Sequence, residues 1–134
     1  MSDDLRFPIG RFVFDPATAA QQREGWILNL ARLPGELEGV VESLDDGQLD
    51  TPYRPDGWTV RQVVHHLADS HMNAYVRIRL GLTEDAPLLK GYDEKLWAEL
   101  ADSLTAPVAP SLSIVEGAHS RWVTLLKKIA PEDF

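Results

Sequence analysis

The run from residue 59 to residue 82 constrains the fold most, because its apolar residues recur with the period of a helix. Thr59 and Gln62 form a T-x-x-Q capping box at its start. At about 100° per residue, one broad face of this segment gathers Val60, Val63, Val64, Leu67, Ala74, Ile78 and Leu82. We therefore predict a long amphipathic helix whose apolar face must be covered by other helices.

Similar patterns predict helices on both sides of this segment. Asp15 followed by Pro16 is typical of a helix start. The helix that follows is expected to break or kink at Pro34, since proline lacks the N–H that an interior position needs. We further predict a second helical piece over residues 35–44, loops over 45–57 and 83–93, a short helix over 94–103, a last helix over 111–129, and an extended arm over 5–14 that lies on the core.

No segment alternates apolar and polar residues, so no sheet is predicted and the fold class is all-α. A length of 134 residues indicates a single domain, residues 1–134. Hydrophobic residues make up 44% of the chain and charged residues 25%, as in ordinary globular domains. A helical bundle is the architecture that this pattern favours.

Charge and composition exclude several classes of function. A formal net charge of -8 is unfavourable for binding nucleic acid or an anionic membrane surface. The chain has no cysteine, so it can offer neither a thiolate zinc site nor a thiol nucleophile of its own. The N-terminus has no apolar signal core and no run is long enough to span a bilayer, so a cytoplasmic protein is expected.

Three of the four histidines lie close together, at positions 65, 66 and 71. Their separations are one, five and six residues, whereas two histidines of one helix chelate a metal when they are four apart. This helix can therefore supply one ligand at most. We predict His66 as that ligand, because its polar stripe could orient the ring; the stripe comprises Thr59, Gln62, His66, Asp69, Ser70, Asn73 and Arg77.

A more ordinary interpretation of the polar stripe is a solvated helix face. On that interpretation the pairs His65–Asp69 and Asn73–Arg77 are surface contacts one helical turn apart. His71 is expected on the apolar side, and both it and His119 would be core or interface histidines satisfied by a hydrogen bond. The four tryptophans would be core or helix-junction aromatics, namely Trp26, Trp58, Trp97 and Trp122.

Four segments together resemble one family over nearly the whole chain: FPIG at residues 7–10, DTPYRPDGWTVRQVVHHLADSHMNAYVRIRLGLTE at 50–84, YDEKLWAELADS at 92–103, and SL…HSRWVTLL at 111–126. They resemble the DinB/YfiT-like metal-dependent hydrolases, and within them the bacillithiol transferase-like branch. The resemblance implies a four-helix bundle of unusual topology. It also implies a metal held by three histidines, of which His66 matches the first and a pair four residues apart in the final helix supplies the others.

The chain departs from this family pattern at its end. It stops at Phe134 without the expected H-x-x-x-H pair, and His119 matches the preceding helix. The resemblance therefore implies a bundle without its last helix, an incomplete ligand set and an uncovered apolar face. A fragment is expected; the alternative is a second copy that covers the seam, as in domain-swapped dimers. A homodimer is the assembly expected from the resemblance.

The resemblance implies an enzyme that transfers a low-molecular-weight, bacillithiol-like thiol to a small electrophile through a divalent metal, with zinc or nickel expected and iron also compatible. Asn73 and Arg77 could contact an anionic cosubstrate. One alternative is hydrolysis by metal-bound water, with Asp69 as a conceivable base. Another is a metal-free helical dimerisation or binding module. No catalytic residue besides the metal ligand is predicted.

Overall fold

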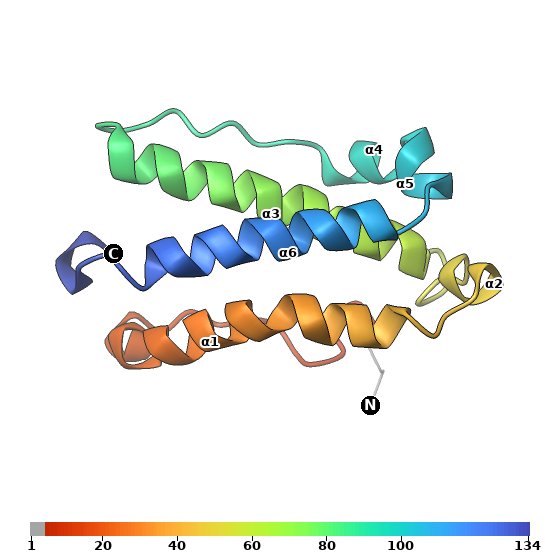
Figure 1. The fold of residues 1–134 in the computed structure, drawn as a ribbon, viewed down its shortest axis with the longest axis horizontal. Helices are drawn as coiled ribbons and strands as arrows, with labels where there is room; N and C mark the ends of the chain where they lie inside the picture. Colours follow the sequence, from red (N-terminus) through yellow and green to blue (C-terminus); the bar gives the residue numbers. More distant parts are fainter. Residues whose placement is uncertain (1–4) are drawn as a thin grey trace.

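The computed structural model describes residues 5–134, and over this range it consists of helices without strands. Its body is formed by the long helices α1 (Pro16–Val41), α3 (Val60–Thr83) and α6 (Ala109–Leu126), which run side by side in Figure 1. The short elements are α2 (Asp46–Leu49), α4 (Glu94–Ala98), α5 (Ala101–Thr105) and the 3-10 turn η1 (Pro131–Asp133). The predicted all-α class is confirmed.

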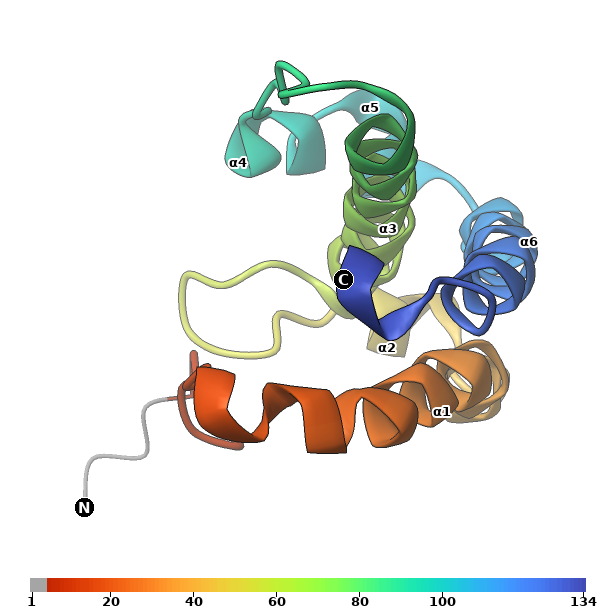
Figure 2. The same ribbon diagram turned by 90° about the vertical axis from the view of Figure 1, so that its left-hand side faces the viewer.

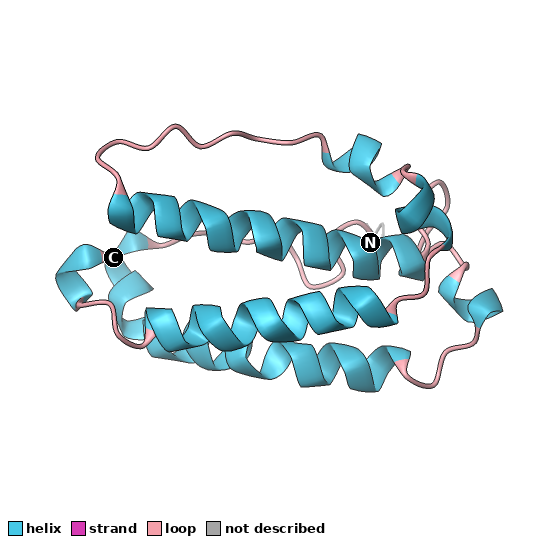
Figure 3. Cartoon of the chain, turned by 45° about the horizontal axis from the view of Figure 1, so that its top comes forward, coloured by secondary structure: helices cyan, strands magenta, loops and turns pink. Residues whose placement is uncertain are grey.

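Helix α6 lies between the other two long helices and packs against both of them. Viewed along the bundle in Figure 2, α3, α6 and α1 occupy three corners, while α4 and α5 lie against α3 on the side away from α1. Figure 3 shows the long loop that returns from the end of α3 to α4 along the same helix. As a result α3 contacts α6 along one side and the α4–α5 pair on another.

The core lies where α1, α3 and α6 meet. Its central cluster consists of Ile27 from α1 and Trp122, Val123 and Leu126 from α6. The partly buried side chains that pack against it are Leu30, Ala74, Tyr75, Ile78 and Ile129. Burial of apolar surface by these side chains is the main term that holds the three helices together.

The start of α3 forms as predicted. The Thr59 hydroxyl accepts a hydrogen bond from the Gln62 N–H, and the Gln62 side-chain oxygen accepts one from the Thr59 N–H. The same Gln62 side chain donates through Nε2 to the carbonyl of Ala98, at 2.8 Å. One amide group therefore caps α3 and holds the end of α4 against it.

Of the predicted break or kink at Pro34, the break is wrong, because α1 continues through this residue as one helix to Val41. Proline has no N–H to donate to the carbonyl four residues earlier, which is that of Leu30. That carbonyl instead accepts a hydrogen bond from Nδ1 of His119 on α6, at 2.7 Å. A distant side chain thus replaces the missing helical bond.

Three other predictions of local structure need correction. The loop predicted after α1 contains the short helix α2, which starts with an Asp45–Gln48 capping box. The predicted helix over 94–103 is two helices, α4 and α5. The final helix spans residues 109–126 instead of 111–129, and its last predicted turn is irregular.

The predicted arm is non-helical as expected, but it does not lie on the core. Its side chains Ile9, Phe12 and Val13 are 99%, 79% and 82% exposed. Of the four tryptophans, only Trp122 is buried, and Trp97 is exposed beside the Tyr92 ring. No helix in the described part of the chain is both long enough and apolar enough to cross a membrane.

Candidate metal site

His65 is a structural residue, because both of its ring nitrogens are engaged within the protein. Nδ1 lies 2.7 Å from the Ser111 hydroxyl at the start of α6, and Nε2 lies 3.1 Å from the Ala106 carbonyl. A carbonyl only accepts, so Nε2 carries the proton and Nδ1 accepts from the Ser111 hydroxyl. The predicted surface pair with Asp69 is therefore wrong, since His65 is buried and faces α6.

His119 and His71 form a hydrogen-bonded pair between α6 and α3. Nε2 of His119 lies 2.7 Å from Nδ1 of His71, and Nδ1 of His119 lies 2.7 Å from the Leu30 carbonyl. His119 is 1% exposed, whereas His71 is partly buried. Burial, followed by the charges of His119 and His66, lowers the pKa of His71 from 6.5 to about 4. Both side chains are interface histidines satisfied by hydrogen bonds, as predicted.

His66 differs from the other three histidines, because neither of its ring nitrogens bonds to another described residue. Its ring is partly buried and packs against the Trp58 indole, with 4.9 Å between ring centroids and 57° between ring planes. Trp58 directly precedes the Thr59 cap, so the start of α3 determines where the indole lies. A fixed imidazole with free nitrogens is what a metal ligand requires.

The polar stripe around His66 is not a solvated face. Gln62 is buried, the other members of the stripe are partly buried, and α4 and α5 pack against α3. Asn73 Nδ2 donates to the Asp69 carbonyl, and Arg77 donates to the Lys90 carbonyl at 3.0 Å. The predicted Asn73–Arg77 surface pair is therefore replaced by bonds to the backbone.

Asp69 is the carboxylate of this stripe. Burial, followed by the negative charge of Asp102 on α5, raises its pKa, while His66 and His65 lower it. Burial, followed by the charges of Asp69 and Glu94, also raises the pKa of the Tyr92 hydroxyl, while Arg77 lowers it. A carboxyl with a raised pKa three residues after His66 in α3 is a feature that accompanies functional sites.

Among the described residues, those beside His66 provide only part of a metal site. His66 can donate one imidazole nitrogen, which suits zinc, nickel or iron. Among residues 5–134, no group of three or more His, Asp or Glu side chains is placed to hold a metal. This part of the chain therefore offers one metal ligand and not a complete set.

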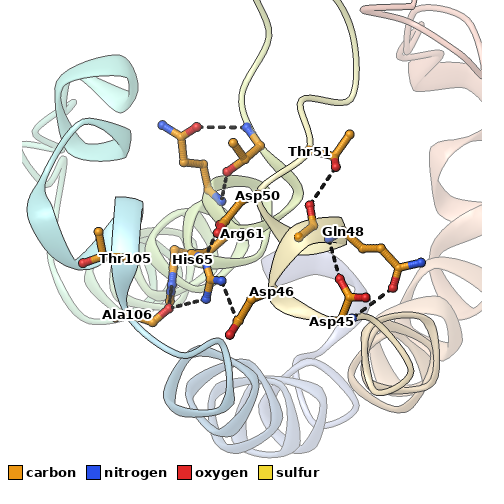
Figure 4. A network of polar contacts seen from close by, with 12 residues as sticks. Asp45, Asp46, Gln48, Asp50, Thr51, Arg61, His65, Thr105 and Ala106 are labelled. Carbon is orange, nitrogen blue, oxygen red and sulfur yellow. Dashed lines mark hydrogen bonds and ion pairs between the residues drawn. The ribbon is translucent and has the colours of Figure 1, made fainter.

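A buried arginine in the first turn of α3 holds a network of polar contacts, which Figure 4 shows. Arg61 is 4% exposed and donates to Asp50 at 2.6 Å, to Asp46 at 2.9 Å and to the Ala106 carbonyl at 3.0 Å. The hydrogen bond from Arg61 lowers the pKa of Asp50, and the two carboxylates raise that of Arg61. The first turn of α3 is thus tied to α2 and to the connection between α5 and α6.

Two features of the site were not predicted from the sequence. The first is the contact between Trp58 in the loop and His66 in the second turn of α3. In the sequence, only the position of Trp58 next to the capping box pointed to it. The chain from Leu30 through His119 to His71 joins three helices. In the sequence, only Pro34 inside an otherwise helical pattern pointed to this chain of hydrogen bonds.

Comparison with known proteins agrees with the resemblance. A family model described as the DinB superfamily matches residues 29–134. The metal-dependent hydrolase candidate YfiT of Bacillus subtilis (strain 168) is 48% identical over 133 residues, which cover 99% of this chain and 75% of the relative. A similarly named protein of Bacillus cereus (strain AH820) is 50% identical over 131 residues, which cover 98% of this chain and 75% of that one.

A solved structure is also similar. It is that of YfiT from Bacillus subtilis, described as a probable metal-dependent hydrolase with an unusual four-helix bundle topology. It has a TM-score of 0.93 and 48% identity, with 98% of this chain and 75% of that chain covered. Three long helices of the present chain thus correspond to part of a four-helix bundle.

Proposed function

Since the chain belongs to the DinB superfamily, we propose that it is a metal-dependent enzyme in which His66 is one ligand of a divalent cation. The observation that carries this proposal is the state of His66, which is partly buried, held against Trp58, and free of hydrogen bonds to described residues through both nitrogens. The names of the relatives, which describe metal-dependent hydrolases, support a metal-dependent activity.

His66 alone would hold a metal weakly, so further ligands are part of the proposal. The resemblance predicts two histidines four residues apart, and residues 1–134 contain no such pair. The matched region is 75% of YfiT, so a quarter of that relative has no counterpart in this chain. With three imidazoles and an open position, a bound cation would lower the pKa of a coordinated thiol or water.

Our finer proposal is transfer of a low-molecular-weight thiol to a small electrophile. The chain has no cysteine, so the sulfur nucleophile would come from a cosubstrate. Arg77 and Asn73 lie on the His66 stripe and are candidates to contact an anionic group of that cosubstrate. Arg77 is partly committed to the Lys90 carbonyl, which leaves its other nitrogens available.

Hydrolysis is the second candidate, and the descriptions of the relatives favour it. It would use the same ligand, with Asp69 as a conceivable base because its raised pKa brings it closer to neutral pH. The metal-free binding module is the third candidate. A homodimer and a cytoplasmic location stay predictions.

Metal binding to matched variants tests the proposal. Titration calorimetry with zinc and with nickel should show that His66→Ala weakens binding at least tenfold, whereas His71→Gln leaves it unchanged. Thiol conjugation to 1-chloro-2,4-dinitrobenzene and a panel of ester and amide hydrolyses, run on the same preparations, then separate the two chemistries. Equal metal affinity in wild type and His66→Ala, with no change in any activity, would overturn the proposal in favour of the binding module.

A further inference from the structure

Two arginines from different helices lie beside one aromatic ring at the seam between α3 and α6. The guanidinium carbon of Arg79 lies 4.4 Å from the centroid of the Tyr75 ring, and that of Arg121 lies 5.6 Å from it. Tyr75 and Arg79 are four residues apart on α3, whereas Arg121 comes from α6. The ring is anchored, because Tyr75 packs against the core cluster. The structure thus brings two positive charges to the same phenol.

Neither of these charges is neutralised within residues 5–134. The guanidiniums of Arg79 and Arg121 form no ion pair and no hydrogen bond with a described residue. Acidic partners are not scarce, since the chain has 21 Asp and Glu for 13 Lys and Arg. Arg32 and Arg61, by contrast, each pair with a carboxylate. Two cations that share one ring repel each other, so an anion between them would be favourable.

The same cluster contains two buried polar atoms without a partner. The hydroxyl oxygen of Tyr75 and Nε of Arg79 are both fully buried, and neither bonds to a described residue. Such atoms are unfavourable because they have lost their hydrogen bonds to water and gained none in exchange. The side chain of Arg121 is exposed, so a ligand can reach the cluster from solvent.

Contact with the ring leaves the donors of the arginines available. A cation near an aromatic face is attracted by the negative charge of the π system, and this attraction uses none of its N–H groups. A guanidinium presents these donors as a planar fork that matches the oxygens of a phosphate group. The terminal nitrogens of Arg79 and Arg121 therefore remain free to donate to an oxyanion.

We propose that Arg79 and Arg121, held beside Tyr75 at the α3–α6 seam, bind a doubly charged oxyanion, namely phosphate or a phosphate monoester. Two guanidiniums match its charge, and the net charge of -8 on the chain disfavours a polyanion such as nucleic acid. The site is separate from the candidate metal site, since Arg79 lies roughly 140° around α3 from His66 at about 100° per residue. Phosphate binding is therefore independent of the proposed function.

Titration calorimetry with inorganic phosphate and with phenyl phosphate, at constant ionic strength, tests this site. The wild type should bind one phosphate group per chain. Arg79→Gln and Arg121→Gln should each weaken binding at least about tenfold, because each removes charged hydrogen bonds to the anion. Tighter binding of phenyl phosphate would identify a phosphate monoester as the ligand, and tighter binding of inorganic phosphate would identify the free anion.

Arg32→Gln is the matched control, since it removes the same charge from an arginine that already pairs with Glu36 on α1. Its affinity for phosphate should equal that of the wild type. An equal loss of affinity in Arg32→Gln and Arg121→Gln would overturn the proposal, because net charge alone would then explain the binding. Absence of saturable binding of both ligands to the wild type would also overturn it. Arg121 is exposed, so Arg121→Gln should stay folded and decides the outcome even where Arg79→Gln is destabilised.

Discussion

Pro34 and His119 are 85 positions apart in sequence but share one backbone carbonyl, that of Leu30. The proline removes the amide that would normally bond to this oxygen, and the histidine replaces it at 2.7 Å. Helix α1 remains continuous through Pro34.

Pro34→Ala should raise the free energy of unfolding by about 1–2 kcal/mol. Alanine is favoured over proline inside a helix by about 3 kcal/mol, and part of this gain is offset by weakening of a hydrogen bond that contributes about 1 kcal/mol. The same change should make the Nδ1–H tautomer of His119 less strongly favoured, because the new amide at position 34 is a second donor to the Leu30 carbonyl. Urea unfolding and histidine ¹⁵N spectra measure the two effects.

Gly35→Ala is the matched control for this change. A Cβ at Gly35 meets no atom within 4 Å, so this variant should be stabilised by up to about 1 kcal/mol. It leaves the Leu30 carbonyl with its native partner and should not alter the spectrum of His119. A shift of equal size in the His119 ¹⁵N resonances of both variants would contradict this. The tautomer of His119 would then depend on the stiffness of α1 and not on the Leu30 carbonyl.

The stability of the protein should fall as the pH drops from about 6.5 to about 4. The pKa of His71 is lowered from 6.5 to about 4 in the folded protein, so between these values the unfolded chain binds a proton that the native protein does not. The contribution of His71 to the free energy of unfolding is therefore complete above pH 6.5 and is lost progressively as the pH falls toward 4. Unfolding in urea across this range, with His71→Gln as comparison, should show a shallower slope in the variant.

Arg61→Met should lower the free energy of unfolding by about 1–3 kcal/mol, since it removes three hydrogen bonds from a buried guanidinium. It should also change the response to acid. The lowered pKa of Asp50 adds stability above its ordinary value of 3.8, and this is lost as the pH falls through the lowered value. In Arg61→Met that acid-dependent loss should shrink. Asp46→Asn, whose carboxylate is 89% exposed, should have a much smaller effect on stability.

Nickel should quench the fluorescence of Trp58, because the indole packs against the proposed metal ligand at 4.9 Å between centroids. Trp58→Phe should remove most of the nickel-dependent change in emission. Trp97→Phe is the control, since Trp97 contacts Tyr92 and not His66. Equal quenching in both variants would place the metal away from His66.

Features with a local cause could be predicted from the sequence. The capping box of α3 needs only residues 59 and 62, and both of its hydrogen bonds are present. The choice of His66 followed from helix geometry, because no other histidine shares the polar stripe. The structure adds that neither ring nitrogen bonds to a residue within 5–134, and His66 as a metal ligand stays a prediction.

Features that depend on distant partners could not be predicted. The carbonyl that Pro34 leaves without its helical donor is satisfied by residue 119, which comes from another helix. A solvated face was the more ordinary interpretation of the polar stripe, because a helical pattern does not tell which neighbours pack against it, and here α4 and α5 pack against α3. His65 looked like a surface residue for the same reason, yet Ser111 and Ala106 take both of its nitrogens.

The carbonyl of Ala106 accepts from Arg61 and from His65 at once, so one peptide group between α5 and α6 is anchored to two successive turns of α3 (Figure 4). Changes of loop length should therefore be tolerated very unequally. Added residues in the exposed stretch 84–91 would extend a connection that makes few hydrogen bonds to α3. One extra residue between 105 and 108 would instead move the Ala106 carbonyl away from Arg61 and His65. Libraries that graft new specificity onto this scaffold are best built in the first stretch.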